Sequence, residues 1–255
     1  MAALITGASS GIGRDIAREL AKKGIPLILV ARRREPMEEL KKELSVPVEI
    51  ITCDLSKKEN VYALYESVKD KKVEILINNA GFGVFGKFCD TSPEREAEMI
   101  SVNITALHIL MKLFLRDMKK RDYGYILNVA SSAAFLPGPL FSSYYASKAY
   151  VYRLSRAADY ELKKDGSHVC VSVLCPGPTA TEFDKVANVR FSIPALSSGF
   201  VAKYAVKKMF ERKKVIVPGA AMKAGRVLAK LAPENLQMLF AYNTQRKKLG
   251  EDERR

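Results

Sequence analysis

The sequence predicts an α/β protein: one domain over residues 1–255, with a doubly wound parallel sheet in three α/β/α layers. Short apolar segments alternate with longer stretches of helical periodicity, which is the pattern of β-α units. Most of the short segments are almost continuously apolar, as expected for strands covered on both faces. A polar or glycine-rich motif follows directly after most of the predicted strands, at the edge where such sheets bind ligands. At 255 residues the chain fits a single domain.

The first predicted strand, residues 2–6, leads into a glycine-rich turn and then a helical pattern to about residue 24. The turn reads Thr6-Gly7-Ala8-Ser9-Ser10-Gly11-Ile12-Gly13, with the spacing G-x-x-x-G-x-G. Glycines let the backbone turn tightly and approach a ligand, and a helix N-terminus offers unpaired N–H groups to an anion. We therefore predict a phosphate-binding turn, with a plain turn as the alternative.

The second predicted strand, residues 26–31, ends at Ala31 and is followed by Arg32, Arg33 and Arg34. A turn that binds NAD is usually followed, about 20 residues on, by a carboxylate for the ribose 2′-hydroxyl. Guanidinium groups stand there instead, and they bind a 2′-phosphate where a carboxylate would repel it. The residues therefore favour NADP. A merely basic helix start is disfavoured, because the helix dipole prefers acids at that end.

Further strands are expected at 48–52, 73–77, 125–130, 169–174 and 215–217, with helices at 57–69, 93–119, 142–164, 220–231 and 234–248. Polar motifs follow four of these strands: Cys53-Asp54-Leu55, Asn78-Asn79-Ala80-Gly81, Ser131-Ser132 and Cys175-Pro176-Gly177-Pro178-Thr179-Ala180-Thr181. In a parallel sheet these motifs meet at one edge.

The predicted helix over 142–164 carries Tyr144 and Lys148, four residues apart and so on one helix face. Tyrosine keeps its proton to about pH 10. An ammonium nearby is expected to lower that pKa and make the phenol a usable acid or base. Tyr145 has no lysine four residues further on. Taken alone, the Tyr-x-x-x-Lys pattern also arises by chance in many helices.

The composition excludes several classes of function. The formal net charge is +14, and residues 200–255 carry 14 basic against 5 acidic side chains. This excess suits an anionic cofactor, an acidic partner or a membrane surface, although a solvated basic surface is the simpler interpretation. No recognised nucleic-acid module accompanies it. Two histidines and four scattered cysteines give little material for a metal site, so we expect none. Without a secretory signal or an apolar run near the length of a membrane span, the expected location is the cytoplasm.

In combination, the motifs T-G-x-x-x-G-I-G, N-N-A-G, a helical Asn103, a serine, Y-x-x-x-K and P-G resemble the short-chain dehydrogenase/reductase family over about residues 2–181. The resemblance implies a Rossmann-type fold. It also implies catalytic roles for Asn103, Ser131, Tyr144 and Lys148. In the family the serine lies thirteen residues before the tyrosine, which selects Ser131 over Ser132. Asn103 would hold a water that links the lysine to solvent; alternatively, it only repairs a helix irregularity.

The same resemblance implies which residues hold the cofactor, NADP(H). The pyrophosphate would lie on the glycine turn, adenosine beside Asp54 and Asn79, and nicotinamide beside the Pro-Gly segment, while Tyr144 and Lys148 reach its ribose. The implied residues are Gly7, Ser9, Ser10, Gly11, Ile12, Gly13, Arg32, Arg33, Asp54, Leu55, Asn79, Ala80, Gly81, Tyr144, Lys148, Pro176, Gly177, Thr179 and Thr181. Ser10 precedes the second glycine, where some NADP-preferring members have a basic residue, so cofactor choice would rest on Arg32 with Arg33.

The pattern resembles the branch with hydroxysteroid and long-chain 3-ketoacyl reductases. A substrate lid is implied at 182–200, and residues 218–255 form a helical extension beyond the family's common form. Apolar residues at Phe82, Phe135, Leu136 and Phe141 suggest a hydrophobic substrate pocket, although core packing would explain several of them. The expected reaction is NADPH-dependent interconversion of a carbonyl and a secondary alcohol on a steroid-like or acyl-chain-like ketone. The alternatives are mainly alcohol oxidation, or a non-catalytic NADP sensor.

The extension also bears on partners. Leu236, Leu239, Phe240 and Asn243 have helical spacing, so three apolar residues lead one stripe, and Arg246, Lys247 and Lys248 follow. We expect the stripe to dock on the protein's own substrate side or on a partner subunit, in preference to weak contact with a membrane surface. A homodimer or homotetramer is expected.

Overall fold

The structure is a computed structural model that describes residues 1–183 and 195–246. Its centre is a parallel sheet of seven strands in the order β3-β2-β1-β4-β5-β6-β9. The strands are β1 (Ala2–Thr6), β2 (Leu27–Ala31), β3 (Val48–Thr52), β4 (Val73–Asn78), β5 (Tyr125–Val129), β6 (Cys170–Leu174) and β9 (Val215–Ile216). Two residues each from β7 (Thr179–Ala180) and β8 (Leu196–Ser197) form a second, small parallel ladder. The doubly wound parallel sheet predicted from the sequence is confirmed.

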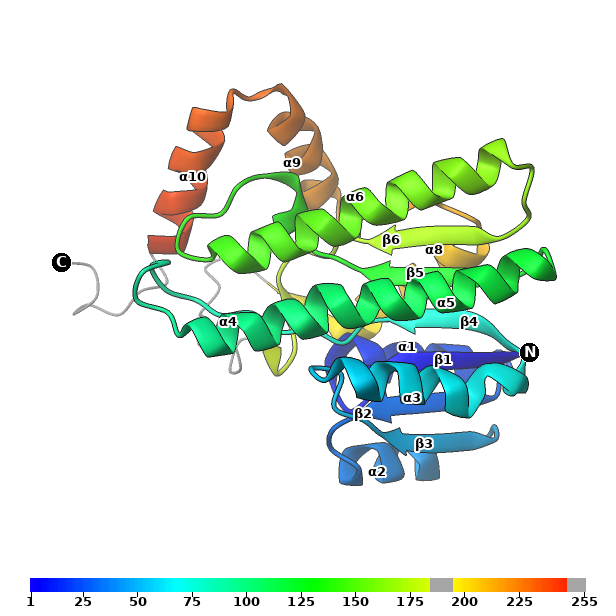
Figure 1. Ribbon diagram of the computed structural model, residues 1–255. Coiled ribbons are helices and arrows are strands. Elements are labelled where there is room, and N and C mark those ends of the chain that lie inside the picture. Colours follow the sequence, from blue (N-terminus) through cyan, green and yellow to red (C-terminus); the bar gives the residue numbers. More distant parts are fainter. Residues whose placement is uncertain (184–194, 247–255) are drawn as a thin grey trace.

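Helices cover both faces of the sheet, which makes three layers (Figure 1). One face packs against α1 (Gly11–Ala21), α2 (Glu35–Glu43) and α8 (Ser198–Phe210), and the other against α3 (Lys58–Val68), α5 (Leu107–Lys120) and α6 (Ser142–Lys164). β2 and β6 are fully buried, because both of their faces are covered. The remaining helical elements are α4 (Pro93–Ile100), α9 (Ala220–Leu231), α10 (Glu234–Arg246) and the short turns η1 (Lys69–Lys71), η2 (Ser101–Ala106) and η3 (Ser132–Phe135).

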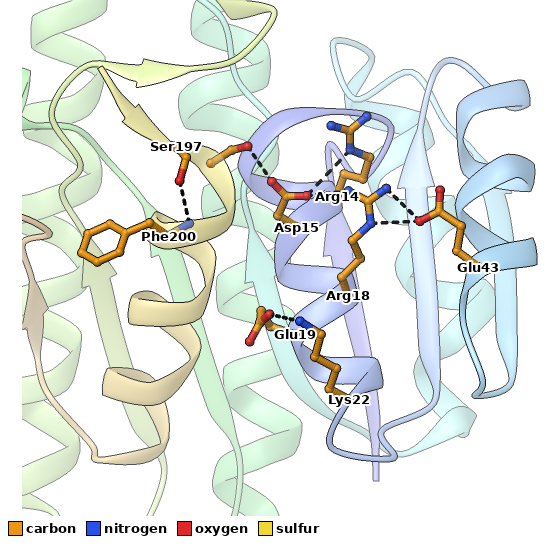
Figure 2. A network of polar contacts seen from close by, with 9 residues as sticks. Arg14, Asp15, Arg18, Glu19, Lys22, Glu43, Ser197 and Phe200 are labelled. Atoms are coloured by element: carbon orange, nitrogen blue, oxygen red, sulfur yellow. Dashed lines mark hydrogen bonds and ion pairs between the residues drawn. The ribbon is translucent and has the colours of Figure 1, made fainter. Parts of the chain in front are cut away.

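A polar network fixes α1 between its two neighbours (Figure 2). Arg18 bridges Asp15 on its own helix to Glu43 at the end of α2, at 2.7 and 2.8 Å. The second carboxylate oxygen of Asp15 accepts a hydrogen bond from Ser198 Oγ at the start of α8, at 2.5 Å. Asp15 is almost buried, so these partners satisfy a carboxylate that would otherwise be costly to desolvate. The helix that begins at the glycine-rich turn is therefore held in place on both sides.

Two helices, α2 and α8, were not predicted. Most of α8 lies beyond the predicted lid, 182–200, which includes its first three residues. Five residues of α8 are buried, and they pack in the core on one face of the sheet. The lid residues 184–194 lie outside the described residues.

The helix predicted over 93–119 is continuous but irregular. α4 and α5 are joined by η2, a stretch of π-helix that contains Asn103. The whole stretch Pro93–Lys120 has an 18-residue window with mean hydropathy 1.4, so it is long and apolar enough to cross a membrane. This amends the expectation that no segment has such a length. Because 44% of that window is buried and α5 packs on β4 and β5, we assign the stretch to the core of the fold.

The predicted C-terminal helices are present as α9 and α10, but most of the apolar stripe of α10 faces outward. Leu236, Leu239 and Phe240 are exposed, whereas Ala241 and Gln245 are buried. Thus Leu236 and Leu239 do not dock on the protein's own substrate side, whereas the expected docking on a partner subunit stays a prediction. Instead, a mixed face of the helix packs inward, and Gln245 Nε2 donates a hydrogen bond to Tyr145 Oη at 2.5 Å.

Candidate active site

One cavity of about 720 Å³ opens where the strands end. It is lined by the turn after β1, the residues that follow β2, β3, β4, β5 and β6, the start of α6, and side chains from α9 and α10. This is the edge at which doubly wound sheets bind ligands. Residues far apart in the sequence meet here because all seven strands point the same way.

The turn after β1 has the form of an anion cradle. Gly7 and Gly11 have positive φ angles of 66° and 53°, which side-chain-bearing residues rarely adopt. Ser10 precedes α1 but its side chain makes no capping hydrogen bond, and the first turn of α1 has no acidic residue. The first N–H groups of the helix therefore keep their capacity for an anion. The donors present fit a pyrophosphate.

Asn79 holds this turn from the neighbouring strand end. Its Nδ2 donates to the carbonyl oxygens of Thr6 and Gly7, at 3.0 and 3.1 Å. Thr6 Oγ1 in turn accepts from the backbone N–H groups of Asn79 and Ala80. The amide of Asn79 is thus occupied in fixing the backbone of the turn, and its predicted place in the adenosine-side wall rests on its position in the cavity lining.

Two arginines after β2 line the same cavity, and each pairs with a glutamate. Arg32 lies 3.1 Å from Glu98, and Arg33 lies 2.6 Å from Glu182 and 3.4 Å from Ser9 Oγ. The arginine side chains are 58% and 52% exposed, so these ion pairs contribute little to stability and can exchange for another anion. Both guanidinium groups are therefore available to a phosphate beyond the ribose.

Asp54, predicted to lie beside adenine, is held as a carboxylate. Partial burial alone would raise its pKa, but hydrogen bonds from the backbone and side chain of Ser56 and the charges of Arg32 and Lys57 outweigh it and lower the pKa. The Ser56 hydroxyl lies 2.8 Å from Asp54 Oδ1. Asp54 and the adjacent Leu55 both line the cavity.

Ser131, Tyr144 and Lys148 converge deeper in the cavity. The Ser131 hydroxyl hydrogen-bonds the phenol of Tyr144. Lys148 Nζ donates to the carbonyl oxygen of Val129 at 3.0 Å and lies 5.7 Å from the ring centre of Tyr144. Gly81 borders the lysine closely: a Cβ atom there would lie 3.2 Å from Lys148 Nζ and 2.8 Å from Asn103 Oδ1. The predicted set is thus brought together from the end of β5, the π-helical turn η2 and the start of α6.

The protonation of this pair differs from the prediction. Burial raises the pKa of Tyr144 well above its ordinary value, although the hydrogen bond from Ser131 acts in the opposite sense. Burial likewise lowers the pKa of Lys148 to about 8. The expected lowering of the Tyr144 pKa by Lys148 is therefore wrong for the protein alone. Desolvation of the buried phenol sets the direction of the shift.

Asn103 is fully buried in the π-helical turn, and its contacts match the structural alternative for this residue. Its Oδ1 accepts from the Phe82 N–H at 3.1 Å, and its Nδ2 donates to the Phe82 carbonyl and to Ser147 Oγ at 2.9 and 3.1 Å. It ties the irregular helix to the strand-end loop and to α6. Its role in holding a water remains a prediction.

The rest of the cavity is largely apolar and includes residues that the sequence analysis missed. Phe82, Phe135, Leu136 and Phe141 all line it, as predicted. Tyr144 stacks on Phe141 with ring centres 4.5 Å apart. Phe183, in the predicted lid, and Phe240, in the predicted apolar stripe, also line it. The wall residues that were not predicted come from α9 and α10: Met222, Gly225, Arg226, Ala241, Thr244 and Gln245. No motif marks them, and only the folded position of α9 and α10 brings them to the site.

Of the predicted cofactor and catalytic residues, all but two line the cavity. The exceptions are Gly13, which packs beneath the turn, and Asn103, whose side chain lies behind Gly81. A Cβ atom at Gly13 would lie 2.5 Å from the Gly7 carbonyl oxygen and 2.4 Å from Asn79 Nδ2. This glycine therefore allows the close packing that shapes the cradle. Among the described residues, no group of His, Cys, Asp and Glu could hold a metal ion.

Residues 1–190 match the family described as short chain dehydrogenase. The chain belongs to the short-chain dehydrogenase family. The match covers the glycine-rich turn, the serine, the Tyr-x-x-x-Lys pair and the Pro-Gly segment, and it ends before α8.

Among curated relatives, human 17-beta-hydroxysteroid dehydrogenase type 3 is 35% identical over 196 residues, covering 73% of this chain and 61% of the relative. Very-long-chain 3-oxoacyl-CoA reductase of Anas platyrhynchos is 31% identical over 201 residues, covering 75% and 64%. A human protein named inactive hydroxysteroid dehydrogenase-like protein 1 is 34% identical over 193 residues, covering 73% and 58%. The chain thus spans about three fifths of the length of these members of the short-chain dehydrogenase family.

Solved structures align over nearly the whole chain. A short-chain dehydrogenase from Sphingobium yanoikuyae in complex with NADPH has a TM-score of 0.82 at 31% identity, covering 92% of this chain and 94% of its own. One from Burkholderia phymatum in complex with NAD has 0.81 at 26%, covering 89% and 92%. The bulky-bulky ketone specific alcohol dehydrogenase from Comamonas testosteroni has 0.78 at 27%, covering 90% and 91%.

Proposed function

We propose that this short-chain dehydrogenase reduces the carbonyl group of a hydrophobic ketone to a secondary alcohol with NADPH. The observation that carries the proposal is the convergence of Ser131, Tyr144 and Lys148 in a cavity whose other wall is apolar and aromatic. Relatives that act on steroid-like and acyl-chain substrates support the substrate class. The structural neighbours bind NADPH or NAD, which supports a nicotinamide dinucleotide cofactor.

The residues divide the work of reduction between them. The bound cofactor supplies the hydride that reaches the carbonyl carbon. Tyr144 donates its phenolic proton to the carbonyl oxygen, which completes the alcohol. Ser131 donates a hydrogen bond to the same oxygen and so orients the carbonyl and stabilises the charge that develops on it. Lys148, when protonated, stabilises the phenolate that remains after the transfer. In the ligand-free protein the raised pKa of Tyr144 keeps the phenol protonated, which is the form that can donate a proton.

The substrate proposal is tested by screening steroid-like and acyl-chain ketones with NADPH and following cofactor absorbance, using two matched variants. Tyr144→Phe should abolish turnover while NADPH binding persists, because only the transferable proton is lost. Tyr145→Phe should keep most of the turnover rate. Its KM for the ketone should change instead, because Tyr145 lies in the wall and bonds Gln245. Equal loss of turnover rate in both variants would mean that the proton donor is misassigned.

For the cofactor, the proposal of NADP rests on Arg32 and Arg33 at the cavity and on the absence of an acid at Ala31, where the strand ends. Arg32→Ala should weaken NADPH binding about tenfold, since a charge-assisted contact contributes roughly 1.5–3 kcal/mol and Glu98 competes for it. NADH binding should change little. Arg34→Ala is the control: Arg34 is also 58% exposed and paired, but it does not line the cavity. Equal losses for NADPH and NADH would refute phosphate recognition by Arg32.

Two alternatives remain within the same site. The first is an enzyme that works mainly as an alcohol dehydrogenase. The ratio of oxidised to reduced cofactor in the cell decides the direction of the reaction, and the geometry of the site does not. A non-catalytic NADP sensor gains some support from the relative named inactive. The complete Ser131, Tyr144 and Lys148 set favours turnover, because a sensor has no need of a proton donor. Assembly as a homodimer or homotetramer and a cytoplasmic location stay predictions, to be checked by light scattering and by cell fractionation.

A further inference from the structure

Helices α9 and α10, which we call the terminal hairpin, carry an unusual number of exposed apolar side chains. They hold eight of the sixteen large hydrophobic residues that are exposed among the described residues. These eight are Val227, Leu228, Leu231, Leu236, Met238, Leu239, Phe240 and Tyr242. Figure 1 shows the hairpin as an arm that projects from the three-layer body. Scattered apolar residues are normal on a surface, but a group of this size marks a site of contact.

Two polar side chains of the hairpin face inward and are hydrogen-bonded. Gln245 is 2% exposed and bonds Tyr145, while Gln237 Nε2 donates to the carbonyl oxygens of Ala229 and Ala232, at 2.9 and 2.8 Å. Leu231 and Phe240, by contrast, are 77% and 68% exposed. Turning the hairpin over to bury its apolar side chains would break the hydrogen bonds of Gln237 and Gln245. Burial of the outer apolar face against something other than water would therefore be favourable.

Charge distinguishes between two coverings of this face. Within the hairpin, residues 220–246 carry four basic side chains and one acidic side chain. Two copies of such a segment would repel each other, whereas an anionic surface would attract it. With 12 and 13 residues, α9 and α10 are each too short to span a bilayer but long enough to lie in its interface. We infer that the terminal hairpin docks the protein on an anionic membrane surface.

The docked face adjoins the active site. Phe240 is both a member of the exposed apolar face and part of the cavity wall. Docking would bring that edge of the cavity to the bilayer, where hydrophobic ketones accumulate. This consequence rests on the proposed function, but docking itself does not.

The test uses the full-length protein and vesicles of phosphatidylcholine, with or without phosphatidylserine. Wild type should sediment with the anionic vesicles, and less so as salt is raised. The double variant Leu228→Gln/Leu239→Gln changes two exposed residues outside the cavity wall and should bind at least about tenfold more weakly, since two apolar side chains no longer enter the interface. Phe88→Gln, at a side chain 67% exposed elsewhere, should bind like wild type. Unchanged NADPH affinity of all variants serves as the check on folding.

Three results would overturn the inference. The first is absence of wild-type sedimentation with anionic vesicles at low salt, which needs no variant. The second is equal binding of the double variant and Phe88→Gln. The third is self-association, measured by light scattering, that the double variant abolishes while vesicles bind nothing; the face would then be an interface between copies. If the wild-type protein bound anionic vesicles but reduced none of the ketones tested, the proposed function would be contradicted and the docking inference would stand.

Discussion

At the level of single residues, Glu182 places a carboxylate among the groups predicted to hold the cofactor. It pairs with Arg33 at 2.6 Å, and it also hydrogen-bonds Ser10 at the start of α1. The hydrogen bond from Arg33 is the main reason that the pKa of Glu182 is lowered, so the carboxylate stays charged. It therefore competes with a cofactor phosphate for the same donors.

Removal of this charge should tighten cofactor binding. Glu182→Gln should lower the Kd of NADPH roughly two- to fivefold, the range expected when a surface ion pair no longer competes. NADH should gain less, because it lacks the 2′-phosphate. The measurement is a fluorescence titration of each cofactor. Glu38→Gln is the matched control, because Glu38 pairs with Arg34 at 2.7 Å but lies outside the cavity lining. Weaker NADPH binding in Glu182→Gln would mean that Glu182 supports the cofactor instead of competing with it.

At the level of elements, the order and type of most strands and helices could be predicted, and the reason is physical. The buried strands are continuous apolar runs, and chemistry-bearing motifs follow them directly, so β1, β2, β4 and β6 were identified within about a residue. The candidate catalytic residues followed from motifs of fixed spacing. Gly7, Tyr144 and Lys148 could be assigned because each sits on a local pattern.

What could not be predicted depends on contacts between distant segments. The orientation of α10 is set by Gln245 meeting Tyr145, a hundred residues earlier in the chain, and an apolar stripe suggested the opposite face. The raised pKa of Tyr144 comes from burial by surrounding elements, which the local spacing of a lysine does not reveal. The π-helical turn around Asn103 likewise arises from contacts with Phe82 and Ser147.

The contact between α10 and Tyr145 gives a prediction for the element as a whole. Gln245→Leu leaves the Tyr145 hydroxyl without this partner, a cost of about 1–3 kcal/mol that loosens the docking of α10. Hydrogen exchange in α10 should become roughly tenfold faster, and the KM for a bulky ketone should change, while NADPH affinity stays the same. Asn243→Leu, at an exposed position of the same helix, should alter neither property. If both variants exchanged at the wild-type rate, the hydrogen bond would not be what holds α10 to the cavity.

At the scale of the whole molecule, burial of the Lys148 ammonium in the active site reduces the free energy of unfolding. Lys148 is 4% exposed, and burial lowers its pKa from about 10.5 to about 8. Below about pH 8 the lysine is charged in both states, and the folded protein carries the full penalty. Between the two pKa values the unfolded chain binds a proton that the folded protein does not, so the free energy of unfolding rises with pH.

This rise can be isolated by comparing wild type with Lys148→Met in the ligand-free protein. The difference in unfolding free energy, wild type minus variant, should increase by about 2 kcal/mol between about pH 7 and about pH 9.5, because the variant has no buried ammonium to neutralise. Urea unfolding at each pH measures it. Lys120→Met removes a charge from a side chain that is 81% exposed and pays no burial cost, so its difference from wild type should show no such rise. A Lys148→Met difference that stays constant with pH would mean that water or a neighbouring group already solvates the ammonium in the folded protein. The buried lysine would then impose no strain on the fold, and its readiness to act on Tyr144 would need another cause.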